Sequence, residues 1–194
     1  NTIQFEKKIV YASYDGNEHG MTAYAYNEDG DKLGEAALEY QNILQTSTNV
    51  SPVENSSAPI DAGMYRVVAI YDNAESEVGT LVITKAVAQG NVTVGNAETT
   101  YGQKLNLNSV IIQTKNIAQR DIAAIQDTIA CAGSDEAIGS HAITVTVPES
   151  VSRNYLRTIK VNKGTHTIIS KEVTITADSC KAQYGNTFPE FTYQ

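Results

Sequence analysis

The chain has 194 residues, of which 41% are hydrophobic and 19% charged, and its formal net charge is −8. This composition predicts a folded protein, long enough for one large domain or two ordinary ones, and excludes a disordered, highly charged polymer. An acidic surface repels phosphate backbones and anionic lipid, so neither nucleic acid nor a membrane is an expected partner of this segment.

Residue usage favours β-strands, since there are 11 tyrosines, 3 phenylalanines and no tryptophan, and threonine and valine are abundant. No stretch approaches the roughly 20 apolar residues that span a bilayer. The first residues lack the basic and apolar regions of a signal peptide, and we expect any signal peptide of the parent protein to lie outside this segment.

Alternation of apolar and polar residues predicts strands with one face in a core. Met64–Tyr71 is apolar on both faces apart from Arg66, which is typical of a central strand. Its expected inward residues are Tyr65, Val67, Ala69 and Tyr71. Strict alternation then recurs in three further runs, Thr80–Thr84, Ser140–Val147 and Val173–Ala177.

Glycines that can adopt positive φ mark the expected turns between strands. The turns are predicted at Tyr14-Asp15-Gly16, Asp29-Gly30, Tyr101-Gly102, Lys163-Gly164 and Tyr184-Gly185. Turns at such short intervals are typical of a β-sandwich. One segment, Ile117–Ile129, has helical periodicity, which predicts a short helix or an irregular crossover.

The sequence also contains an internal repeat. Gly79–Lys85 aligns with Gly164–Lys171, allowing one extra residue, and a short Val-Thr strand and a Tyr-Gly pair follow each copy. A fixed period predicts tandem units, here a first repeat over residues 1–86, a second over 87–171 and the start of a third over 172–194. Those last residues cannot close a core alone, so we expect them to pack as extra strands along the second repeat or to be poorly ordered.

The order of these motifs resembles the MBG family, whose immunoglobulin-like repeats occur in large bacterial surface proteins and adhesins. The matching pieces of repeat two and the third unit are Asp121-Ile122-Ala123-Ala124, the strand from Gly139, Asn154-Tyr155, the strand from Gly164, Val173–Ala177, Tyr184-Gly185 and Phe188-Pro189-Glu190-Phe191. Repeat one matches more loosely, and its loop from Gln41 to Pro59 departs from the compact pattern. The resemblance implies all-β, tandem immunoglobulin-like β-sandwiches, extracellular and wall-attached or secreted, with no catalytic residues.

Side chains suited to catalysis or metal binding are few. Cys131 and Cys180 are predicted to be small buried or half-buried residues, with a disulfide as the alternative. His141 and His166 lie on predicted strands and could approach each other, but no cysteine or carboxylate completes a ligand set at short range. His19 lies beside a turn and should be solvated. We therefore expect no metal and no cofactor.

Two acidic segments superficially suggest calcium. Asn27–Asp31 has its glycine at the fourth position of a calcium loop instead of the sixth, and Leu38 where a glutamate belongs, so it predicts an Asp-Gly hairpin turn. Ser134-Asp135-Glu136 is expected to be a polar loop. No nucleophile, phosphate-binding or zinc motif occurs, and an enzyme is not expected.

Most tyrosines fall within strand patterns and should be core or corner residues, but Tyr24 and Tyr26 share a strand face and are the candidates for ligand binding. We expect a non-catalytic spacer, in which the short linkers Lys85–Gly90 and Lys171-Glu172 restrict the angle between neighbouring repeats. The alternative is an adhesion module that binds a carbohydrate or a host surface protein through Tyr24 and Tyr26 or the Gln41–Pro59 loop. A contiguous exposed aromatic patch would favour that alternative.

Overall fold

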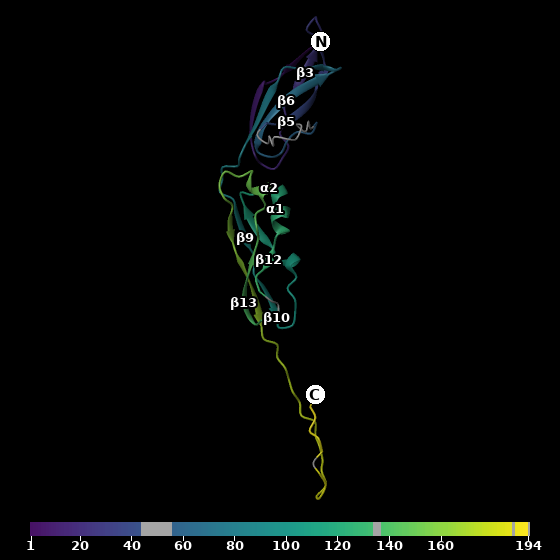
Figure 1. Ribbon diagram of the computed structural model, residues 1–194, viewed down its shortest axis with the longest axis vertical. Helices are drawn as coiled ribbons and strands as arrows, with labels where there is room; N and C mark the ends of the chain where they lie inside the picture. Colours follow the sequence, from purple (N-terminus) through teal and green to yellow (C-terminus); the bar gives the residue numbers. More distant parts are fainter. Residues whose placement is uncertain (44–55, 134–136, 188, 194) are drawn as a thin grey trace.

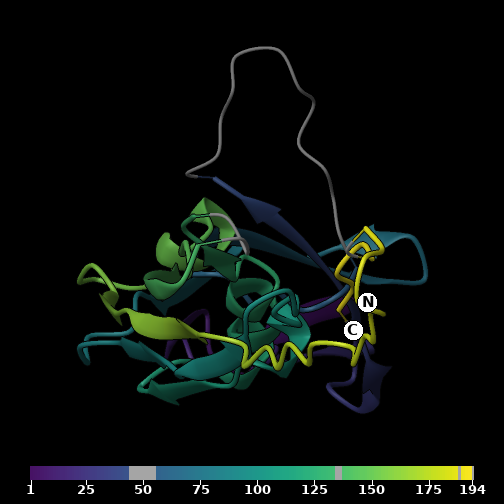
Figure 2. The same ribbon diagram turned by 90° about the horizontal axis from the view of Figure 1, so that it is seen from below.

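The structure is a computed structural model that describes residues 1–43, 56–133, 137–187 and 189–193. The predicted fold class is confirmed, because the chain is all-β with immunoglobulin-like β-sandwiches and only short helices among the described residues. The described strands form two groups, β1–β8 and β9–β15, that share no sheet. Figure 1 shows them as two bodies along the long axis, and the view along that axis in Figure 2 superimposes them. We call them the N-terminal unit and the C-terminal unit.

The N-terminal unit has two sheets. One contains, in order, β1 (Thr2–Phe5), β3 (Ala23–Tyr26) and β4 (Lys32–Glu35). The other contains β2 (Ile9–Ser13), β8 (Gly79–Thr84), β6 (Gly63–Tyr71) and β5 (Ala37–Asn42), with β7 (Ala74–Glu75) paired to β6. Pairing of β2 with β8 is parallel, and the other pairs are antiparallel.

The C-terminal unit also has two sheets. One contains, in order, β10 (Ala97–Thr100), β15 (Gly164–Ile169), β13 (Gly139–Thr144) and β12 (Ala130–Cys131). The other contains β11 (Ile112–Lys115), β9 (Asn91–Val94) and β14 (Lys160–Asn162). A 3-10 turn (Leu107–Ser109) and two helices, α1 (Gln119–Gln126) and α2 (Glu149–Ser152), connect the strands, and both helices lie at the end that faces the N-terminal unit (Figure 1).

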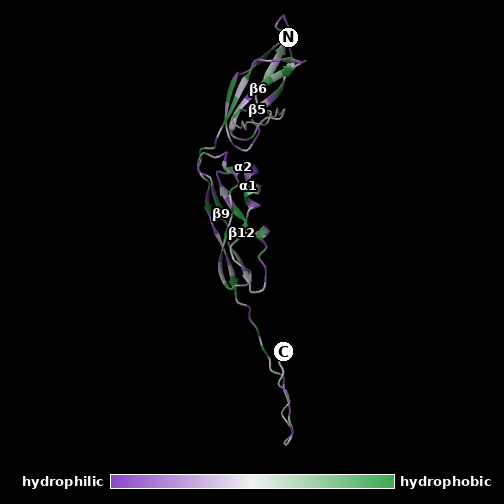
Figure 3. Cartoon of the chain, viewed as in Figure 1, coloured by the Kyte–Doolittle hydropathy of each residue, from purple (hydrophilic) through white to green (hydrophobic). Residues whose placement is uncertain are grey.

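The alternation of residues along the strands produces the core as predicted. In β8, Leu81 and Ile83 are buried while their neighbours are more exposed, and in β6 Tyr65, Val67 and Ala69 are buried. The predicted strand from Ser140 ends at Thr144, although Ile143 and Val145 are both buried. Figure 3 shows hydrophobic and hydrophilic residues interspersed along the strands of both units. Each buried aliphatic side chain of this kind contributes about 1.5–3 kcal/mol.

A three-strand arrangement occurs in the same form in both units. In the order β2-β8-β6 and again in β10-β15-β13, a parallel pair is followed by an antiparallel pair. The residue after the parallel strand then donates its backbone N–H to the last residue of its partner, Tyr14 to Thr84 and Tyr101 to Ile169, both at 2.8 Å. Tyr14 and Tyr101 therefore occupy the same position in their units.

The structure places the predicted helix at α1, within Ile117–Ile129, with Ile125 fully buried. Four of the predicted turn glycines have positive φ, namely Gly16, Gly30, Gly102 and Gly185. The turn predicted at Lys163-Gly164 is wrong, because Gly164 begins β15 and pairs with Ile143. Glycine is needed there for a close approach, since a Cβ atom on Gly164 would lie 2.1 Å from the carbonyl oxygen of Gly95.

Residues beyond β15 extend away from the C-terminal unit (Figure 1). The strand predicted over Val173–Ala177 does not form, and its only described ladder contact is a single bridge from Ala177 to Tyr193. Val173 and Ile175 are exposed, so these residues do not pack along the C-terminal unit, which was one of the two expected arrangements. An alternating strand needs a facing surface to bury its apolar side, and the described chain provides none there.

Candidate functional site

The two units meet through their linker and through two clusters of polar side chains. Ala86 in the linker forms a parallel bridge with Tyr155. Its N–H donates to the carbonyl of Asn154 and its carbonyl accepts from Leu156, each at 2.9 Å. The linker is therefore held by backbone hydrogen bonds to the C-terminal unit and is not a free tether.

The Asp121 cluster, which consists of Tyr14, Asp121 and Tyr155, lies at the centre of the junction. Asp121 is 4% exposed and belongs to the first turn of α1, where the helix dipole favours a carboxylate. Its Oδ2 atom accepts hydrogen bonds from the hydroxyls of Tyr14 at 2.8 Å and Tyr155 at 2.7 Å. Since Tyr14 belongs to the N-terminal unit, one buried carboxylate joins the two units.

The two tyrosine rings also contact each other. Their centroids are 5.7 Å apart and their planes meet at 74°, a favourable edge-to-face arrangement. The N–H of Ala118 donates to the Tyr155 hydroxyl at 2.8 Å, so that hydroxyl both accepts and donates. Among the described residues, no buried side-chain nitrogen or oxygen atom lacks a hydrogen-bond partner, as a stable buried polar cluster requires.

The Asp61 cluster, which consists of Asp61, Arg120, Arg153 and Asn154, forms a second attachment. Asp61 belongs to the N-terminal unit, and its carboxylate accepts from Arg120 at 3.3 Å, Arg153 at 2.5 Å and the Asn154 side chain at 3.0 Å. Asn154 is fully buried, and its side-chain oxygen accepts from the N–H of Ala62 at 2.8 Å. Asn154 therefore forms hydrogen bonds with both the backbone and a carboxylate of the N-terminal unit.

Gly16 forms the third attachment by close approach. A Cβ atom on Gly16 would lie 2.8 Å from Cβ of Ala118 and 3.3 Å from Cγ of Arg120. With its φ of +86°, this position favours glycine for two independent reasons. The residue lets the turn after β2 rest directly on the start of α1.

Three separate segments of the N-terminal unit and its linker thus contact the helical end of the C-terminal unit. They are the Tyr14–Gly16 turn, the Asp61-Ala62 segment and Ala86. A single contact would leave a hinge, but three attachments from separate segments oppose bending more strongly than one. A continuous hydrophobic cluster also runs through the junction, from Leu81 through Tyr14 and Tyr155 to Ile125.

The junction tyrosines should ionise late. Burial and the neighbouring Asp121 carboxylate raise the pKa of Tyr14, and burial raises the pKa of Tyr155, which Asp121 raises further. Burial also raises the pKa values of Tyr40 and Tyr65. Because the folded protein retains these protons where the unfolded chain loses them, their contribution to stability is complete below a pH of about 10 and is lost as the pH rises above that.

Phenolate absorbance, followed as the pH is raised, measures this effect. We expect these four tyrosines to ionise only as the protein unfolds, whereas in urea all 11 should ionise together near a pH of about 10. Urea midpoints measured alongside should fall over the same alkaline range. Native protein that ionises all its tyrosines in one step near 10 would contradict the burial of the junction.

The candidate ligand-binding residues Tyr24 and Tyr26 lie on β3, as predicted, and both are half-buried. The ammonium group of Lys32 lies 3.1 Å from the centroid of the Tyr24 ring, a cation–π contact that covers one face of the ring. A sugar that stacked on this face would have to displace the lysine. Ligand binding by Tyr24 and Tyr26 stays a prediction.

The structure brings His141 and His166 together, as the strand pattern suggested. They are paired across β13 and β15, with ring centroids 6.2 Å apart. His166 is buried, and its ring nitrogens lie 2.8 Å from the Thr99 hydroxyl and 3.8 Å from Cys131 Sγ. Among the described residues, no three histidine, cysteine or acidic side chains are arranged to hold a metal ion.

Neither Cys131 nor Cys180 forms a disulfide, so the alternative of a disulfide is not what the structure contains. Cys131 is half-buried as predicted, but Cys180 is exposed, because the segment that carries it packs on no other part of the described chain. His19 is not simply solvated, since its Nε2 atom lies 3.0 Å from the Asp15 carboxylate.

The acidic segment Asn27–Asp31 forms the predicted hairpin turn. It joins β3 to β4, with positive φ at Gly30 and a backbone hydrogen bond between Asn27 and Asp31. Ser134-Asp135-Glu136 and most of the Gln41–Pro59 loop lie outside the described residues. No helix in the described ranges is long and apolar enough to cross a membrane.

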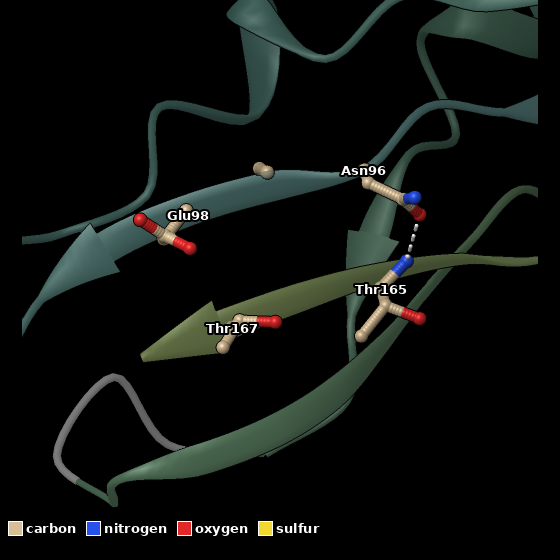
Figure 4. A pocket seen from close by; sticks show the side chains of 5 residues that line it. Asn96, Glu98, Thr165 and Thr167 are labelled. Carbon is tan, nitrogen blue, oxygen red and sulfur yellow. Dashed lines mark hydrogen bonds between the residues drawn. The ribbon is translucent and has the colours of Figure 1, made fainter. Parts of the chain in front are cut away.

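A shallow polar depression lies on the outer face of the parallel pair β10 and β15. Figure 4 shows Glu98 and Thr167 on neighbouring strands, and Asn96, which accepts a hydrogen bond from the N–H of Thr165 at 2.9 Å. It is open to solvent and lined by few, mostly neutral groups. This depression lacks the enclosed, largely apolar walls of an ordinary small-molecule site.

No protein family model matches the sequence, and no similar protein was found among curated proteins. Among solved structures, the chain is similar to Down Syndrome Cell Adhesion Molecule (DSCAM) isoform 1.30.30, N-terminal eight Ig domains, with 11% identity, a TM-score of 0.28, and coverage of 91% of this chain and 27% of that one. It is also similar to Dscam1 isoform 6.9, N-terminal four Ig domains, with 8% identity, a TM-score of 0.26, and coverage of 88% and 46%. This chain spans less than half the length of either structure, and at these TM-scores the likeness says nothing of its function.

Proposed function

We propose that the chain is a non-catalytic spacer of a bacterial cell-surface or adhesin-like protein, built from two tandem repeats over residues 1–86 and 87–171. The resemblance of its motifs to MBG repeats supports the cell-surface setting. The shared strand order of β2-β8-β6 and β10-β15-β13 supports the division into repeats. Its partners in this role are the neighbouring repeats of the same chain.

One observation carries the proposal, namely that the Asp121 carboxylate binds a tyrosine hydroxyl from each unit. Hydrogen bonds to a buried carboxylate are short and strong, and losing one leaves a buried polar group unsatisfied. Bending at the junction would break the bond from Tyr14. The units should therefore hold one mutual orientation, which is what a spacer requires.

Residual dipolar couplings, measured on isotopically labelled protein, test this orientation. In the native protein, we expect couplings from both units to fit one alignment tensor. Gly16→Ala should force the turn away from Ala118, so that the two units require tensors of different magnitude. Each tensor reports directly on how freely its unit moves relative to the other.

Gly102→Ala is the matched control. Gly102 has a φ of +87°, almost that of Gly16, but a Cβ atom there would have no neighbour within 4 Å. Backbone strain is thus common to the two variants, and the clash at the junction is specific to Gly16→Ala. The spacer proposal would be wrong if the native protein already required two tensors.

A further inference from the structure

The end of the C-terminal unit that points away from the N-terminal unit repeats the surface used at the junction. Tyr101 occupies the position of Tyr14, as the equivalent backbone hydrogen bonds show. Gly63 and Gly139 are likewise equivalent, since each begins its strand opposite the penultimate residue of β8 or β15, Ile83 or Ile168. Ile138 therefore corresponds to Ala62, one residue before that glycine.

These equivalent positions differ in their exposure. Tyr14 is 4% exposed because the C-terminal unit covers it, whereas Tyr101 is 47% exposed. Ile138 is 60% exposed, whereas Ala62 is half-buried and donates its N–H to Asn154. Gly102 has positive φ and open space around it, where Gly16 touches Ala118. The far end is an uncovered copy of a surface that is covered in the N-terminal unit.

We infer that Tyr101, Gly102 and Ile138 form an acceptor surface for another unit of the same type, continued from residues 172–194. This inference rests on the proposed function, because it extends the same junction to the next neighbour. Residues 172–194 support this occupant, since they repeat the Val-Thr strand and Tyr-Gly pair that begin the C-terminal unit. Gly185 also has a φ of +88°, close to the +86° of Gly16 and the +87° of Gly102.

The side chains of the acceptor surface indicate which groups its partner must present. Tyr101 offers a hydroxyl, so the partner provides an acceptor such as the carboxylate of Asp121 in the first turn of a helix. The residue that corresponds to Asp61 is Ala137, and it cannot bind two arginines. Since Ile138 stands beside it, the partner presents an apolar surface where the C-terminal unit presents Arg120 and Arg153.

An extended chain tests the inference. Residues 1–171 are followed directly by a second copy of residues 87–171, so that Lys171 takes the place that Ala86 has in the first linker. The added unit has the sequence of one that already folds in the parent protein. A second extended chain carries Ala137→Asp and Ile138→Ala, which give the acceptor surface the two residues, Asp61 and Ala62, that meet the arginines and Asn154 at the first junction.

Nitration by tetranitromethane, mapped by peptide mass spectrometry, reports on each tyrosine. In the parent protein, Tyr101 should react and Tyr14 should not. In one or both extended chains, we expect the reactivity of Tyr101 to fall about tenfold toward that of Tyr14, as expected for a hydroxyl that becomes buried and hydrogen-bonded. Tyr11, which is 73% exposed on β2, should react equally in all proteins.

Gly102→Ala in the protected chain is the specificity control. The backbone strain that Gly102→Ala introduces is the same with and without the added unit. Restored nitration of Tyr101 in this variant would therefore show that the added unit contacts Gly102. Tyr101 that stays as reactive as in the parent in both extended chains overturns the inference. If Tyr14 itself reacts, the proposed function fails, and this result is separate because it concerns the first junction.

Discussion

Replacing Gly164 with alanine should destabilise the C-terminal unit by about 3 kcal/mol. The added Cβ would lie 2.1 Å from the carbonyl oxygen of Gly95 and 2.9 Å from that of Val94. Both atoms belong to the backbone, so no rotamer change relieves the overlap. Either β15 or the chain after β9 must move, and each is held by its sheet.

Gly79→Ala is the matched comparison. Gly79 begins β8 as Gly164 begins β15, and each pairs with a buried residue of the neighbouring strand, Val67 or Ile143. A Cβ atom on Gly79 would meet the ends of the Met21 and Phe5 side chains at 2.9 and 3.0 Å, and these can turn aside. We expect a loss of about 1 kcal/mol from Gly79→Ala, near the low end for added core atoms.

Native-state hydrogen exchange separates the two effects, because it reports on each unit alone. Amides of β13 should lose protection in Gly164→Ala while those of β6 keep it. In Gly79→Ala, the amides of β6 should lose protection, by a smaller amount, while those of β13 keep it. Equal losses in the two variants would show that the backbone near Gly95 yields as readily as a side chain.

Strands and the helix could be predicted from sequence because the patterns that define them are local. Leu81 and Ile83 are buried, as the alternation of apolar and polar residues around them predicts. The helix α1 forms where the spacing of the isoleucines predicts it. Tyr65 and Tyr155 are buried as expected, and Tyr71 is half-buried. Glycine is harder to interpret, since a turn and a close approach both require it, and Gly164 proved to be the second.

The junction could not be predicted from sequence. Tyr14 and Asp121 are 107 residues apart, and Ala62 and Asn154 are 92 apart. In the sequence, each of these is an ordinary turn, helix or loop residue, and only the contact between the two units gives it a role at the junction. The sequence offered two signals, an acidic residue at the start of the predicted helix and a repeated Tyr-Gly turn. No rule based on local sequence predicts that Asp121 and Tyr14 contact each other.

Removing the Asp121 carboxylate should cost about 3 kcal/mol, because Asp121→Ala leaves the hydroxyls of Tyr14 and Tyr155 buried without their acceptor. An unsatisfied buried donor costs about 1–3 kcal/mol, and two are created here. Tyr155 keeps the hydrogen bond that it accepts from Ala118, so the larger share of the loss should come from Tyr14. Urea unfolding at neutral pH measures the total.

A double-mutant cycle isolates the part that joins the two units. Tyr14→Phe alone removes a hydrogen bond to a carboxylate and should destabilise the protein, but in the Asp121→Ala background it removes an unsatisfied hydroxyl and should cost little. The coupling between Tyr14 and Asp121 is then expected to be about 1.5–3 kcal/mol. This coupling is the free energy with which the hydrogen bond holds the units in one orientation.

Tyr40→Phe provides the control cycle. Tyr40 is also buried, but its hydroxyl accepts from the N–H of Met21 and shares no hydrogen bond with Asp121. Its effect should add to that of Asp121→Ala within about 0.5 kcal/mol. If Tyr14 were equally additive, the Asp121 carboxylate would not couple the units, and their orientation would have to depend on the Asp61 cluster and the approach of Gly16 to Ala118.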